Sequence, residues 1–190
     1  MFPIEAFQHT IDKAAEILKR HGIRFHLTGG VTSSLYADPR MTQDIDIVID
    51  PVATQQNLEG LLSSLKTSDF LHSESDVRSA VRDAGLFQLF DKEEALKLDL
   101  YPRELIPGEL DRSVLLEVFK GVRYPVASRI DISSAKLVWI SKGSHKGRRD
   151  LRYLWRTATD DETDAIQSIA VGLGLEQLLV EVLSEPDEIE

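Results

Sequence analysis

Alternating aspartate and isoleucine over residues 44–50 constrains this chain more than any other stretch. Because successive side chains of a strand point to opposite faces, the three isoleucines of this run share one face and Asp44 and Asp46 share the other. Residues two apart are roughly 6–7 Å apart at Cα, so both carboxylates can aim at one point. Two like charges held so close are unfavourable unless a cation lies between them, and Mg²⁺ is a hard ion that prefers oxygen ligands. The competing interpretation is a half-buried strand with a wet face that carries Asp.

A Gly29-Gly30 pair lies between a predicted strand over residues 23–28 and a predicted short helix over residues 30–37. Glycine permits positive φ and close backbone approach, and the N-terminus of the following helix offers free N–H groups to a phosphate. The spacing matches neither a dinucleotide fingerprint nor a Walker loop. On its own such a pair is more often a plain turn.

A third carboxylate, Asp99, lies between Leu98 and Leu100 in a predicted strand over residues 96–101. A turn over residues 91–94 predicts an antiparallel hairpin with the preceding apolar run, residues 86–90. If the Asp99 strand also lies beside the Asp44–Asp46 strand, its carboxylate is about 5 Å away laterally. Three carboxylates could then share two metal ions about 3.5–4 Å apart. The alternative is a solvent-facing Asp near the end of a strand.

Taken together, these motifs resemble the nucleotidyltransferase superfamily, which has the polymerase-β-like fold. The run GGVTSSLYADPRMTQDIDIVID resembles, more narrowly, the bacterial branch that contains the abortive-infection-type nucleotidyltransferase toxins. The resemblance covers roughly residues 24–150. It implies an α/β (α+β) fold with a mixed β-sheet flanked by helices, and a helical segment at the C-terminus.

The resemblance also implies functional residues. By it, Asp44, Asp46 and Asp99 are the catalytic residues and bind Mg²⁺ or Mn²⁺, and an NTP is the substrate. The same resemblance assigns nucleotide binding to a larger set: Thr28, Gly29, Gly30, Ser33, Arg40, Thr42, Lys136, Arg148 and Arg149.

Two of these assignments have open alternatives. Arg40 either neutralises the charge of the triphosphate or ties its loop to an acidic neighbour. By the resemblance, Lys136 reaches the nucleotide phosphates, and the basic stretch at residues 142–150 lines or braces the site through Arg148, Arg149 and Asp150. In the alternative, Lys136 is a solvated helix residue and that stretch is a solvated turn.

The length of 190 residues predicts one domain or one domain with an appendage. We expect a nucleotidyltransferase-like core over residues 1–128 and a helical segment over residues 129–190 packed on it. Within the core we expect a helix over residues 53–66, a helix over 110–120, and a short strand over 123–127 whose Pro125 indicates an edge position.

Composition narrows the setting. The chain has no cysteine, no apolar run near the ~20 residues of a membrane span, and no recognisable signal peptide. We therefore expect a cytoplasmic protein that does not associate with a membrane. Its net charge of −10, from 32 acidic and 22 basic residues, disfavours general coating of nucleic acid.

We therefore predict a Mg-dependent nucleotidyltransferase that moves an NMP from an NTP to a hydroxyl acceptor, such as a tRNA or other RNA end or a protein, and releases pyrophosphate. One alternative is an adenylyltransferase for small molecules such as antibiotics. Another is a non-catalytic nucleotide-binding module of a toxin–antitoxin-like pair, with a cognate antitoxin-like partner. The set of three carboxylates argues against a silent module. A further alternative is an α/β interaction protein in which these features are structural.

Overall fold

The computed structural model describes residues 4–36 and 44–186. The helices it describes are α1 (Ile4–Arg20), α2 (Gly29–Tyr36), α3 (Pro51–Gln56), α4 (Leu58–Lys66), α5 (Glu74–Asp83), α6 (Arg129–Ser141), α7 (Gly147–Arg156), α8 (Asp160–Gly172) and α9 (Glu176–Ser184). The strands are β1 (Phe25–Thr28), β2 (Asp44–Ile49), β3 (Phe70–Leu71), β4 (Phe87–Asp91), β5 (Lys97–Tyr101), β6 (Val114–Phe119) and β7 (Val122–Val126).

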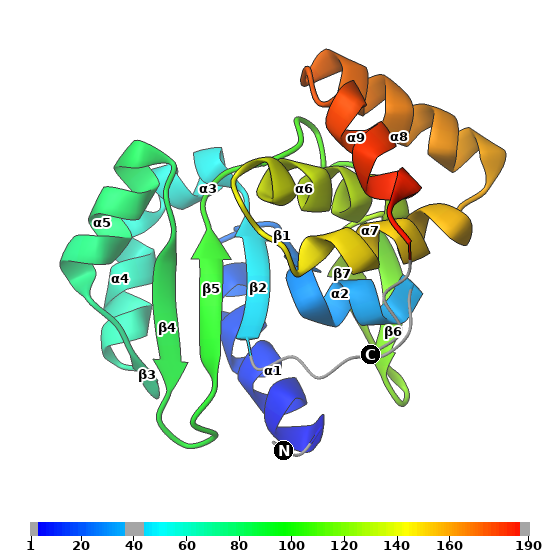
Figure 1. Ribbon diagram of the computed structural model, residues 1–190. Coiled ribbons are helices and arrows are strands. Elements are labelled where there is room, and N and C mark those ends of the chain that lie inside the picture. The colour runs from blue at the N-terminus through cyan, green and yellow to red at the C-terminus, as the bar shows by residue number, and fades with distance from the viewer. Residues whose placement is uncertain (1–3, 37–43, 187–190) are drawn as a thin grey trace.

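The strands form one mixed sheet in the order β3-β4-β5-β2-β1-β7-β6 (Figure 1). β2 lies near the centre, antiparallel to β1 and parallel to β5. The β4–β5 hairpin is antiparallel, as the turn at residues 91–94 predicts. The α/β architecture with a mixed sheet and flanking helices is confirmed.

One face of the sheet is apolar and packs on the N-terminal helices. Ile45 and Ile47 of β2 are fully buried in one hydrophobic cluster with Ile11 of α1, Leu61 of α4 and Val77 of α5. Burial of each such side chain contributes roughly 1.5–3 kcal/mol, which explains why the isoleucine face of β2 turns inward. The aspartate face is thereby directed to the other side of the sheet, toward α2 and α6.

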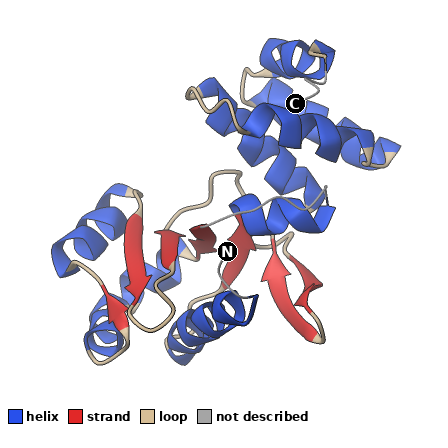
Figure 2. Cartoon of the chain, turned by 60° about the horizontal axis from the view of Figure 1, so that its bottom comes forward, coloured by secondary structure: helices blue, strands red, loops and turns tan. Residues whose placement is uncertain are grey.

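Helices α6–α9 gather at the α2 side of the sheet and project away from it (Figures 1 and 2). They have a separate apolar cluster, which includes Leu137 of α6, Leu151 of α7, Ile166 of α8 and Leu179 of α9. We propose that the boundary between core and helical segment falls at residues 128–129. In the described part of the chain, no helix combines the length and the apolar character needed to cross a bilayer.

Two predictions in the second half of the core are wrong. The segment predicted as a helix over 110–120 contains β6, which pairs with β7 as a hairpin closed at Gly121, where φ is +76°. The Pro125 strand, β7, is not an edge strand, since it lies between β1 and β6. β7 pairs with β1 at one position, Leu27 opposite Val126. Pro125 has no backbone N–H to donate, and so short a pairing does not require one from it.

The N-terminal half also differs from the pattern. The helix predicted over residues 53–66 is divided into α3 and α4, which meet at Asn57. Helix α5 lies where we expected only a connecting piece between strands. It is capped by Ser73, whose hydroxyl accepts a hydrogen bond from the Asp76 amide.

Candidate functional site

Four polar side chains form one row across the sheet. Thr28 of β1 lies opposite Asp46 of β2, Asp46 lies opposite Asp99 of β5, and Asp99 lies opposite Gln88 of β4. Because cross-strand partners lie about 5 Å apart, the parallel β2–β5 register brings the two carboxylates side by side. The row therefore places two of the three predicted metal ligands next to each other on the face opposite the apolar core.

The neighbouring row contains the third carboxylate and a lysine. Asp44 lies opposite Lys97, and the Lys97 ammonium lies 3.3 Å from Oδ1 of Asp44 and 3.1 Å from Oδ2 of Asp99. The other oxygen of Asp99 accepts a hydrogen bond from the Gln88 amide at 3.0 Å. Asp99 is buried, at 8% exposure, so these contacts compensate a charge that water does not reach.

Asp46 has the most strained electrostatic position of the three. Burial raises the pKa of its carboxyl, and the nearby Asp99 and Asp44 carboxylates raise it further, although the Tyr101 hydroxyl donates a hydrogen bond to Oδ1 at 3.3 Å. Burial and the Asp46 charge also raise the pKa of Tyr101, so this hydroxyl remains a donor. A cation placed here would relieve the repulsion between the carboxylates.

Gly29, the first residue of α2, makes room for Asp46. It has φ of +64°, and a Cβ built on it would lie 1.9 Å from Oδ2 of Asp46. Gly30 follows it as a buried residue, and the Ser33 hydroxyl donates a hydrogen bond to the Gly29 carbonyl at 2.7 Å. The start of α2, with its free N–H groups, therefore lies directly beside the Asp46 carboxylate.

An open cleft of about 500 Å³ lies between this end of the sheet and α6. Its walls include Gly29 and Asp46, Lys136 and Trp139 of α6, and Arg103 from the loop after β5. Arg103 makes no hydrogen bond or ion pair with any residue that the structure describes. This volume includes space that is continuous with solvent.

Lys136 reaches the cleft from a buried ion pair. Its ammonium donates to Oδ2 of Asp150 of α7 at 2.7 Å, and both residues are less than a tenth exposed. Lys136 is also near enough to Asp46 to lower the pKa of that carboxyl. The pair thus holds a positive charge at the cleft wall opposite the carboxylates.

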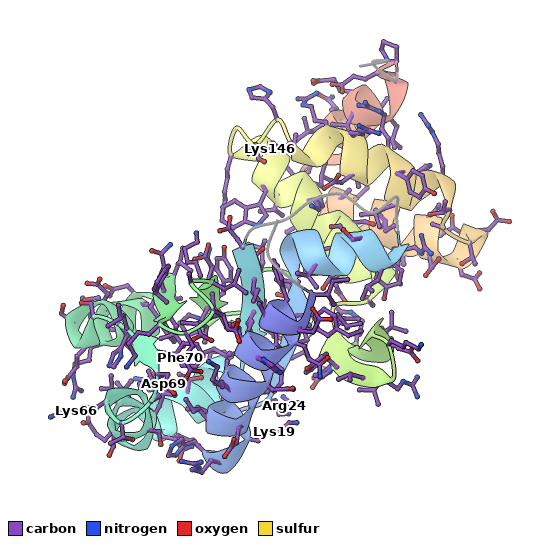
Figure 3. The ribbon with its side chains drawn as sticks, turned by 90° about the horizontal axis from the view of Figure 1, so that it is seen from below. Lys19, Arg24, Lys66, Asp69, Phe70 and Lys146 are labelled. Carbon is purple, nitrogen blue, oxygen red and sulfur yellow. The ribbon has the colours of Figure 1, made fainter. Side chains whose placement is uncertain are left out.

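The remaining predicted residues lie elsewhere. Arg148 pairs with Glu181 at 2.9 Å and also with Glu185, beyond the end of α9, and Arg149 is exposed on α7. Neither residue is part of the cleft wall. Figure 3 shows Lys146, just before α7, in the upper part of the view, and Lys66, Asp69 and Phe70 at the lower left. Arg40 and Thr42 lie outside the described residues.

The donor chemistry of the site fits a divalent cation. Within residues 4–36 and 44–186, no three acidic or histidine side chains are grouped closely enough to hold a metal ion. Instead the Lys97 ammonium stands as a cation between Asp44 and Asp99. Asp44, Asp46 and Asp99 share one face of two neighbouring strands, and two of them already flank one positive charge. Carboxylate oxygens are the ligands that Mg²⁺ and Mn²⁺ prefer.

Sequence reasoning missed several residues of this site. Lys97 and Tyr101 are two positions from Asp99, so strand alternation alone could have placed them on the same face. Gln88 required the hairpin register. Arg103 and Trp139 enter from a loop and from α6, and no motif marks them.

No family model matches the sequence, and no curated protein sequence matches it either. Solved structures do match. An antigenic nucleotidyltransferase-like protein from Paracoccidioides brasiliensis is 18% identical, with a TM-score of 0.52 over 96% of this chain and 94% of that chain. The lincosamide antibiotic adenylyltransferase LnuA, lincomycin-bound, is 15% identical, with a TM-score of 0.52 over 83% of this chain and 99% of that one.

A third match, the antibiotic-resistance factor ANT(2'')-Ia, is 14% identical, with a TM-score of 0.50 over 92% of this chain and 87% of that chain. All three cover most of both chains, so the correspondence is between whole folds. This protein has the nucleotidyltransferase fold. The narrower likeness to abortive-infection-type toxins stays a prediction.

Proposed function

We propose that this protein is a metal-dependent nucleotidyltransferase that moves an NMP from an NTP to a hydroxyl acceptor and releases pyrophosphate. The observation that carries the proposal is the pairing of Asp46 with Asp99 at the edge of a cleft that also contains the start of α2 and Lys136. Carboxylates for a cation and positive groups for phosphates thus converge on one place.

The triphosphate is bound by positive groups around the cleft. The N–H groups at the start of α2 suit a phosphate beside Asp46, because a helix N-terminus attracts anions. Lys136 is held charged against Asp150 on the opposite wall, and the guanidinium of Arg103 is available for a further anionic oxygen. We include Arg103 in the proposal because a cation in a cleft with no ion-pair partner among the described residues is suited to an anionic ligand.

Asp44, Asp46 and Asp99 would hold Mg²⁺ or Mn²⁺. When bound, such an ion neutralises phosphate charge and lowers the pKa of an acceptor hydroxyl. Asp99, which lies beside Asp46, can accept the proton of that hydroxyl. The acceptor oxygen then bonds to the α-phosphorus while the bond from that phosphorus to the pyrophosphate oxygen breaks.

A small-molecule acceptor is the version of this proposal that the fold comparisons favour. LnuA is described as an antibiotic adenylyltransferase with lincomycin bound, and ANT(2'')-Ia as an antibiotic-resistance factor. The cleft is open to solvent, so part of an acceptor bound beside a nucleotide would remain exposed. An RNA end or a protein as acceptor, and an antitoxin-like partner, stay predictions from the sequence.

The test is transfer of label from each α-labelled NTP, with and without Mg²⁺, to pools of small hydroxylated compounds, to total RNA and to lysate protein. The Asp46→Asn variant is run beside Asp164→Asn, which changes an exposed aspartate of α8. We expect Mg-dependent labelling by the wild type and by Asp164→Asn, and at least a ~10³-fold loss in Asp46→Asn because the transition-state charge loses its support. Undiminished transfer by Asp46→Asn would overturn the proposal, and the labelled pool identifies the acceptor class.

A further inference from the structure

Lys97 occupies an unusual place for a cation in this site. It lies on β5 two residues before Asp99, on the same face, and directly opposite Asp44. Its ammonium bridges these two carboxylates at 3.3 and 3.1 Å. A positive charge of the protein itself therefore lies between two of the three carboxylates of the proposed donor set.

The surroundings show why a charge is needed there. Asp99 is buried and lies directly opposite Asp46, so two carboxylates face each other across the β2–β5 pair. Gln88 satisfies one oxygen of Asp99 by a neutral hydrogen bond, which leaves the charge of the carboxylate to be balanced by Lys97. Without such a cation, the neighbouring carboxylates would repel one another.

The Lys97 side chain is also able to leave. It is 34% exposed, and Asp44 is 53% exposed, so the bridge is open to water on one side. A lysine on a flexible four-carbon stem can move its ammonium into solvent at little cost. This separates it from Lys136, whose side chain and that of its partner Asp150 are each only 10% exposed.

We propose that Lys97 is an internal counter-ion of the carboxylate cluster, which keeps Asp44 and Asp99 in place when no divalent cation is bound and is displaced when one binds. This rests on the proposed function, since it needs the carboxylates to be the metal site. Lys97 is a positioning residue in this scheme. Its competition with the metal raises the free cation concentration at which the site becomes occupied.

The alternative is an ordinary cross-strand salt bridge that only joins β2 to β5. Removal of Lys97 would then lower stability by the same amount with or without metal and leave the affinity for metal unchanged. The counter-ion role predicts that removal of Lys97 tightens cation binding, and the salt-bridge role predicts no change. Binding of the metal alone therefore decides between them.

The experiment is titration of Mn²⁺ into nucleotide-free protein, with free Mn²⁺ followed by electron paramagnetic resonance. Lys97→Met keeps the apolar stem and removes the charge. Lys92→Met is the matched control, because Lys92 lies in the β4–β5 turn and contacts the Ser68 carbonyl and Asp69 rather than the cluster. Lys97→Arg is the conservative variant that keeps the charge.

We expect Lys97→Met to bind Mn²⁺ about tenfold more tightly than the wild type. A neighbouring charge within about 4–6 Å shifts a pKa by about one unit or more, which is a tenfold change in an equilibrium constant. Lys92→Met and Lys97→Arg should bind as the wild type does. In thermal unfolding, added Mn²⁺ should raise the Tm of Lys97→Met by more than that of the wild type. Equal or weaker Mn²⁺ binding by Lys97→Met overturns the proposal.

Asp99→Asn separates this proposal from the proposed function. In both the wild-type and the Lys97→Met background it should weaken Mn²⁺ binding, which locates the ion at the cluster. Wild-type binding that Asp99→Asn weakens but Lys97→Met does not improve would overturn the role of Lys97 and leave the proposed function standing. Failure of every protein to bind Mn²⁺ would overturn both.

Discussion

Oδ2 of Asp46 occupies the space that a side chain at Gly29 would need, because a Cβ on that glycine would lie 1.9 Å from it. The relationship joins the two motifs that stand out in the sequence, the glycine pair and the aspartate strand. It also means that the backbone at the beginning of α2 packs directly against the Asp46 carboxylate, with no side chain between them.

Gly29→Ala is therefore expected to damage the site beyond its effect on stability. Gly22→Ala is the matched control, since Gly22 has φ of +65° and a Cβ there would meet no atom within 4 Å, while Gly29 has φ of +64° and Asp46 in contact. Each variant should lose about 1–2 kcal/mol of unfolding free energy for the left-handed backbone. Gly29→Ala should lose more than Gly22→Ala, because its Cβ would also lie 2.8 Å from the Cβ of Asp46. Only Gly29→Ala should lose nucleotidyl transfer, measured beside urea denaturation. Equal transfer by both variants would contradict the prediction.

The Lys136–Asp150 pair should show the cost of breaking a buried ion pair. Lys136→Met is expected to lower the unfolding free energy by about 3–5 kcal/mol, because the carboxylate it contacts stays buried. The double variant Lys136→Met/Asp150→Leu should recover most of that stability and none of the transfer activity. Recovery of activity in the double variant would show that Lys136 is structural only.

Asp91 should make the fold sensitive to acid. Burial raises the pKa of its carboxyl, but hydrogen bonds from Lys13, Thr10 and the backbone amides of Glu93 and Glu94 outweigh that effect and lower the pKa. A lowered pKa means that the stabilisation is present above the ordinary value of 3.8 and is lost as the pH falls through the folded-state pKa.

Asp91→Asn is accordingly expected to lose about 2 kcal/mol at pH 7, since a buried hydrogen-bond network loses the negative charge and one of the two acceptor oxygens of Asp91. The difference from the wild type should shrink as urea denaturation is repeated at lower pH, down to and below the ordinary value of 3.8. Asp69→Asn, at an aspartate that is 58% exposed, should change stability by less than about 0.5 kcal/mol. A difference that does not depend on pH would contradict the assignment to Asp91 ionisation.

Trp139 should report ligand entry into the cleft. The chain has two tryptophans, and Trp139 lines the cleft at 38% exposure while Trp155 packs against the α6–α9 cluster. Addition of Mg²⁺ with a non-hydrolysable NTP analogue should change the emission of a Trp155→Phe variant, because Trp139 exchanges water for ligand. The emission of Trp139→Phe should stay the same. A response confined to Trp139→Phe would place the ligand elsewhere.

Much of the site could be predicted because it is local in sequence. The alternation from Asp44 to Asp50 and the Leu-Asp-Leu run around Asp99 each determine which face a carboxylate takes. The glycine pair could also be predicted to precede a helix, because that signal too lies in adjacent residues. The sequence pattern failed at β6, a short apolar segment that we predicted as a helix. We predicted no helix at α5, although Val77, Ala80 and Val81 recur there at helical spacing.

What the sequence alone determined is the set of chemical groups and their faces, since both depend on strand and helix periods. Only the tertiary structure decided which groups meet, because the parallel pairing of β2 with β5 sets Asp46 opposite Asp99 and brings Lys97 between Asp44 and Asp99. It also placed Arg103 and Trp139 beside the carboxylates and joined Lys136 to Asp150. Such contacts link residues far apart in the chain, and they depend on the strand order and on the packing of α6, neither of which a local pattern encodes.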